Sequence, residues 1–99
     1  MKTELVQPIN SYRKKMYDDA ISALIEILDG DKQNWFAWFY LAMSYARSNR
    51  PENGYRIFQV IAAMCPDTVL RDAARDGAAD LEYEIINGGR EDGDMLMSA

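Results

Sequence analysis

The 99-residue chain contains no histidine and only one cysteine, Cys65. Histidine is the commonest general base and nitrogen ligand in proteins, so its absence excludes Ser-His and Cys-His nucleophile pairs and most zinc sites. One cysteine can neither form an internal disulfide nor build a cysteine-rich metal site. We therefore expect a non-enzymatic protein without catalytic, metal or cofactor-binding residues, in which Cys65 packs between helices.

Long apolar runs and positive charge are also scarce. No apolar stretch reaches the ~18–20 residues that cross a bilayer, and residues 1–8 lack the apolar run of a secretory signal. These features predict a cytoplasmic protein with no membrane partner. The net charge is −5, which argues against nucleic acid as a partner because phosphate backbones bind basic surfaces.

The charges are unevenly distributed along the chain. Residues 1–16 carry four basic side chains against one acid, whereas residues 67–94 carry nine acids against three arginines. A chain with a basic and an acidic end can associate head to tail, although solvated helix faces of opposite sign are the simpler explanation.

Apolar residues make up 48% of the chain and recur at helical spacing. One buried face is predicted between residues 10 and 28, at Tyr17, Ala20, Ile21, Leu24, Ile27 and Leu28. Lys14 and Lys15 either form a turn between two helices or lie within one, so residues 8–28 are left as one helix or two. Gly30 suits a left-handed residue that ends the helix.

Further helices are expected over 35–47, 51–64 and 69–86. Asn34 is a good N-cap, Pro51 suits a first helical position, and Asp67 or Thr68 caps the last helix. We expect one domain over residues 1–89, followed by a flexible acidic tail over 90–99.

The segment from Trp38 to Pro66 combines aromatic, small and proline residues at fixed spacing. It reads Trp38-x2-Leu41-Ala42-x2-Tyr45, then Gly54-x3-Phe58, then Pro66. This spacing resembles the tetratricopeptide repeat, with Ala42 in the glycine position and Gly54 in the alanine position. Small residues at 42 and 54 let the two helix backbones approach closely.

The resemblance implies an all-α fold of about five helices in antiparallel hairpins, stacked as a right-handed tetratricopeptide-like mini-solenoid. The best repeat covers 35–68, and a partial copy lies 34 residues earlier, where Ala20 matches Gly54 and Leu24 matches Phe58. The helix over 69–86 is expected to cap the array with a polar outer face. Its inward stripe is Leu70, Ala73, Ala74, Gly77, Leu81 and Ile85.

The helix over 35–47 is too apolar for a single buried stripe. In tetratricopeptide arrays the first helices line a concave groove. By that resemblance the partner-binding residues would be Phe36, Phe39, Tyr40, Met43 and Arg47. The alternative is that the N-terminal segment and the last helix close over these side chains and make an ordinary core.

The expected function is protein–protein interaction, as an adaptor, assembly factor or chaperone that binds a partner's helix or extended peptide. The small cytoplasmic chaperones of type III secretion systems look similar in size and acidity. The sequence also leaves open a structural homo-oligomer, including a homo-dimer, and a small-ligand binder or enzyme. Residues Met95, Leu96 and Met97 are a candidate internal ligand for the groove.

Overall fold

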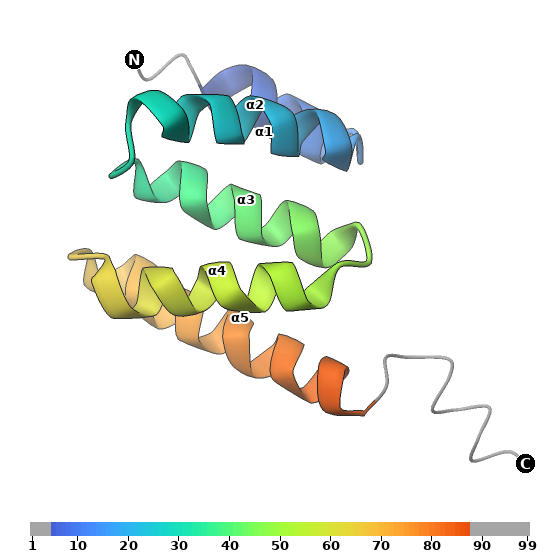
Figure 1. The fold of residues 1–99 in the computed structure, drawn as a ribbon, viewed down its shortest axis with the longest axis vertical. Coiled ribbons are helices and arrows are strands. Elements are labelled where there is room, and N and C mark those ends of the chain that lie inside the picture. Colours follow the sequence, from blue (N-terminus) through green and yellow to red (C-terminus); the bar gives the residue numbers. More distant parts are fainter. Residues whose placement is uncertain (1–4, 88–99) are drawn as a thin grey trace, which may run out of the picture.

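The computed structural model describes residues 5–87 and shows five α-helices within them, with no strand in that range (Figure 1). The helices are α1 (Val6–Arg13), α2 (Tyr17–Gly30), α3 (Trp35–Arg47), α4 (Pro51–Met64) and α5 (Thr68–Ile86). The expected all-α fold of about five helices is confirmed. The predicted tail over 90–99 and its candidate ligand residues lie outside the described residues.

The helices pack in the order in which they occur along the chain. Each one lies against the next, and α3 also touches both α1 and α5. Figure 1 shows the α1–α2 pair at one end of the molecule, α3 in the middle, and the α4–α5 pair at the other end. This consecutive packing is consistent with a repeat of helical hairpins.

The chain breaks between α1 and α2 at the two lysines. Lys15 has a left-handed φ of 65°. The Met16 N–H donates to the Ser11 carbonyl at 2.8 Å, and the Lys15 N–H donates to the Tyr12 carbonyl at 3.0 Å. These two bonds form a Schellman motif, which satisfies the last carbonyls of α1. Residues 8–28 therefore belong to two helices.

The helix starts follow the sequence predictions. The Ala37 N–H donates to the Asn34 side chain at 3.2 Å, and Asp67 accepts from the first amides of α5. Pro51 opens α4, where its missing N–H costs nothing. The prediction for Gly30 was wrong. Gly30 is the last residue of α2, no left-handed φ occurs there, and Asp31 leaves the helix with φ −147°.

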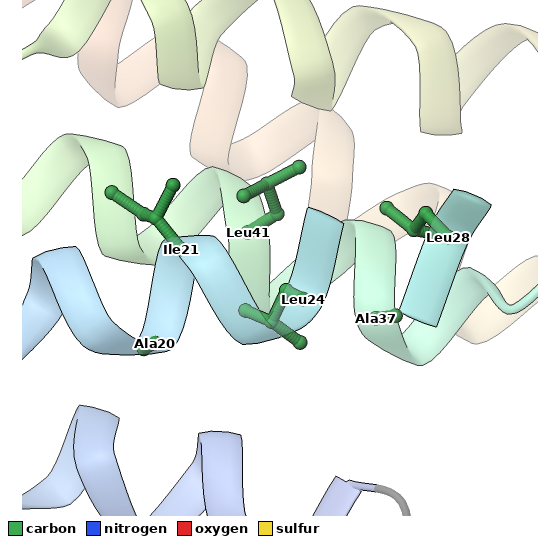
Figure 2. Close-up of a cluster of buried hydrophobic side chains, with 6 residues drawn as sticks. All are labelled: Ala20, Ile21, Leu24, Leu28, Ala37 and Leu41. Atoms are coloured by element: carbon green, nitrogen blue, oxygen red, sulfur yellow. The ribbon is translucent and has the colours of Figure 1, made fainter. Parts of the chain in front are cut away.

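Two apolar clusters form the core, and α3 contributes to both. The first joins α2 to α3; Figure 2 shows Ile21, Leu24 and Leu28 of α2 together with Leu41 of α3. The second contains Ala42, Phe58, Ile61, Cys65, Ala74 and Leu81. Trp38 packs against both clusters, so its indole links the two ends of the array. The expected packing role of Cys65 is confirmed by its 1% exposure.

The close approach of α3 and α4 occurs at Gly54. A Cβ on this buried glycine would lie 2.8 Å from the Ala42 carbonyl oxygen and 3.1 Å from Leu81 Cδ1. Real Cβ atoms do not come this close to backbone, so only glycine fits at this helix separation. Similarly, a Cβ on Gly77 would meet the Phe58 ring at 2.7 Å. Both small residues hold neighbouring helices close together.

We expect Gly54→Ala to lower the free energy of unfolding by about 1–3 kcal/mol, because the backbone of α3 must move to admit the methyl group. Gly30→Ala is the matched control. It is also helical, has nothing within 4 Å of its added Cβ, and should be neutral or stabilise by about 0.4–1 kcal/mol. Urea unfolding followed by circular dichroism measures both. Equal stabilities for the two variants would contradict the close-approach argument.

Candidate protein-interaction surface on α3

Helix α3 buries one side completely and leaves large apolar side chains on the other. Ala37, Leu41, Ala42 and Ser44 are its buried residues. Trp38 is held in place by a bond from its Nε1–H to the Lys32 carbonyl at 2.8 Å, and Trp35 stacks on it with ring centroids 6.1 Å apart. The remaining rings lie on a surface that the hairpin partner α4 covers only in part.

The five predicted partner-binding residues differ in exposure. Phe36 is 55% exposed and Arg47 is also exposed, whereas Phe39, Tyr40 and Met43 are half-buried. Phe36, Tyr40, Met43 and Arg47 follow one helical stripe, at i, i+4, i+7 and i+11. We call these four residues the α3 stripe. Phe39 lies beside it and packs edge-on against Phe58 of α4, with centroids 5.4 Å apart.

Tyr12 of α1 covers part of the α3 stripe. Its ring packs edge-on against Tyr40 with centroids 5.5 Å apart, and its hydroxyl lies 3.8 Å from Met43 Sδ. The Arg47 Nε–H donates to the same hydroxyl at 2.7 Å. The N-terminal helix thus closes over one end of the stripe, while Phe36 at the other end stays open to solvent.

The sequence analysis missed Tyr12. A signal was present, because the 34-residue shift that matches Ala20 with Gly54 also matches Tyr12 with Ala46. A large ring therefore replaces a small residue at the same place in the repeat. That substitution indicates that α1 contacts α3, the first helix of the following repeat. In the structure the Tyr12 ring packs against Tyr40 of α3.

A second polar contact ties the two hairpins together. Arg50 in the α3–α4 turn forms an ion pair with Asp18 of α2, with 2.5 Å between Nη2 and Oδ1. The Arg50 guanidinium also lies 5.2 Å from the Tyr45 ring centroid. Both partners are accessible to solvent, so the pair contributes tenths of a kcal/mol to stability rather than several.

Two clefts occur elsewhere on the described surface. An open cleft of about 1130 Å³ lies between α1 and α2, and a smaller one lies between the start of α4 and the end of α5. None of the five predicted residues lines either cleft. Among residues 5–87, no group of three or more acidic or cysteine side chains is arranged to hold a metal ion. No helix in that stretch is long and apolar enough to span a bilayer.

We expect Tyr12→Phe to cost about 0.5–1.5 kcal/mol of stability, because it removes the Arg47 hydrogen bond and keeps the ring on Tyr40. Tyr12→Ala should cost more, because the ring contacts with Tyr40 and Met43 are also lost. Thermal unfolding compares the two variants, with Tyr83→Phe as the control at a 71% exposed ring. If Tyr12→Ala and Tyr12→Phe have equal stability, the ring does not cover the stripe.

Comparison with known proteins gives a distant similarity. No protein-family model and no solved structure matches the chain. It is 29% identical over 87 residues to human Superkiller complex protein 3; the match covers 88% of this chain and 5% of that protein. The chain is thus similar to one short stretch of a much longer protein that is named as part of a complex, and its five packed helices are consistent with a tetratricopeptide-like arrangement.

Proposed function

We propose that the chain is a non-enzymatic protein-interaction module that binds an amphipathic helix or extended peptide of a partner protein on the α3 stripe. The observation that carries this proposal is the exposure of Phe36, whose ring is 55% open to solvent beside the half-buried Tyr40 and Met43. A cluster of aromatic and methionine side chains is typical of surfaces that receive an apolar helix face.

The distant similarity to Superkiller complex protein 3 supports a role in association with other proteins. The lack of histidine supports the non-enzymatic part of the proposal. The single buried thiol fits the reducing cytoplasm as the place of action. By analogy, the small chaperones of type III secretion systems, which the chain resembles in size and acidity, hold an amphipathic helix of a secreted subunit.

The binding energy would come from apolar burial around Phe36. An aromatic ring that moves from about half exposed to buried gains about 1–2 kcal/mol at roughly 25 cal/mol per Å². Arg47 adds specificity at the far end of the stripe, because a partner carboxylate can replace the Tyr12 hydroxyl as its acceptor. A partner helix with an apolar stripe and an acidic residue two to three turns along fits these positions.

The test uses a photo-crosslinking amino acid at position 36 in the full chain, followed by affinity measurements with the captured protein. We expect Phe36→Ala to weaken that partner's binding about 30-fold, the equivalent of about 2 kcal/mol. Val69→Ala is the control, because Val69 is 76% exposed on α5. A partner that binds Phe36→Ala as tightly as wild type, or that Val69→Ala weakens equally, would rule out the α3 stripe as the site.

A further inference from the structure

Among residues 5–87, no helix neighbours the α1–α2 hairpin on its outer side. Helix α3 covers its inner side, and the open cleft of about 1130 Å³ runs along the opposite side. Apolar side chains that line this cleft remain accessible, with Val6 56% and Met16 48% exposed. In a stack of helices this is the position that another helix occupies.

The other end of the array carries an exposed helix face. On α5, Ala79, Tyr83 and Ile86 lie at i, i+4 and i+7, on the side turned away from the core. Tyr83 is 71% exposed and Ile86 is 72% exposed. This short apolar stripe is flanked by the exposed acids Asp80 and Glu82. Glu82 and Ile86 lie at its edge, because they also line the smaller cleft beside the start of α4. Helix α5 therefore has the apolar stripe and charged flank of a helix that docks into a groove.

The charges of the two ends are complementary in one orientation. The cleft begins at Lys14, with Arg13 and Lys15 beside it, and reaches Glu26 and Asp31 at its other end. Along α5 the charges of the first half balance, with Arg71 and Arg75 against Asp72 and Asp76, and Arg75 is paired with Asp72. The second half carries the acids Asp80, Glu82 and Glu84. The acidic half of α5 therefore faces the lysines when α5 runs antiparallel to α2, and the balanced first half lies beside Glu26 and Asp31.

The two acids near the basic residues 13–15 do not abolish the attraction to the acidic half of α5. Asp19 lines the cleft near Lys14 and opposes the acidic half of α5. Asp18 is paired with Arg50, so the three basic side chains at 13–15 still outnumber the acids near them. Two α5 faces brought together antiparallel would instead place Asp76 and Asp80 of one copy against the same acids of the other. That symmetric arrangement is therefore repulsive.

We infer that the chain associates head to tail with a second copy of itself, with the outer face of α5 seated in the cleft between α1 and α2. The two contact surfaces are different, so the contact does not close on itself and lengthens into chains. One helix in one cleft makes an interface at the small end of the known range, below roughly 1,200 Å². The association is therefore weak, concentration-dependent and weakened by salt. This inference does not depend on the α3 stripe.

The experiment is sedimentation equilibrium of the full chain at low salt over a range of concentrations, with two charge-reversed variants. Lys14→Glu/Lys15→Glu disables the cleft end and Asp80→Lys/Glu82→Lys disables the α5 end. We expect the average mass of wild type to rise continuously above the 11.3 kDa monomer. Each variant alone should associate at least about tenfold more weakly.

The decisive result comes from mixing the two variants. The unchanged α5 of Lys14→Glu/Lys15→Glu fits the unchanged cleft of Asp80→Lys/Glu82→Lys. The altered cleft of the former is acidic and the altered α5 of the latter is basic, so these two surfaces also attract each other. An equimolar mixture should therefore associate again, in alternating order, although each variant alone is weakened. The chain that carries all four substitutions should also recover association, because both signs are reversed together. Asn53→Lys/Gln59→Lys, on exposed positions of α4, is the control for added positive charge and should behave as wild type.

Four results would overturn the inference. If wild type remains a monomer at ~1 mM, a second copy does not bind in the cleft. A mass that stops at the dimer would show a symmetric contact. Variants that associate as strongly as wild type, while circular dichroism shows intact helices, would place the contact on another surface. A mixture that associates no better than its separate components would show that the two ends do not bind each other.

Discussion

The backbone contact between α3 and α4 at Ala42 and Gly54 fixes the separation on which the rest of the structure depends. At this distance Trp38 reaches both apolar clusters, and Leu81 of α5 reaches the same glycine. A wider spacing would separate the clusters and expose Phe58, which already packs against Gly77 and Phe39. Because core packing leaves little free volume, a small displacement at Gly54 is transmitted to both ends of the array.

Much of this architecture was predictable from local signals. Asn34, Pro51 and Asp67 mark helix starts by known chemistry, and the structure places a helix after each. The small residues within Trp38–Pro66 predicted the close approach. The α1–α2 break was ambiguous because a lysine occupies the left-handed position where glycine is usual. Gly30 misled for the opposite reason, since a glycine that is free to adopt a left-handed φ need not do so.

The site was predictable only in outline. Periodicity identified α3 as too apolar for one stripe, and Phe36 is indeed open to solvent. Whether the five residues bind a partner stays a prediction. Periodicity within one helix does not reveal which neighbour covers which ring or which ring stays exposed. Tyr12 covers Tyr40 and Met43, and Phe58 packs on Phe39. The alignment of the two repeat copies indicated the cover by α1, because it matches Tyr12 with the much smaller Ala46.

Tyr12 also affects how a partner would use the surface. Displacing Tyr12 costs its exposed hydrogen bond with Arg47, about 0.5–1.5 kcal/mol, and its contacts with Tyr40 and Met43. Burying the exposed half of Phe36 gains about 1–2 kcal/mol. A ligand that buries Phe36 and also replaces the Tyr12 ring on Tyr40 and Met43 would therefore displace Tyr12 and still bind. A ligand that reaches only Arg47 cannot, because it exchanges one exposed hydrogen bond for another. If the α3 stripe binds a partner as proposed, the contact would favour partners with a continuous apolar face over partners that offer only acidic side chains.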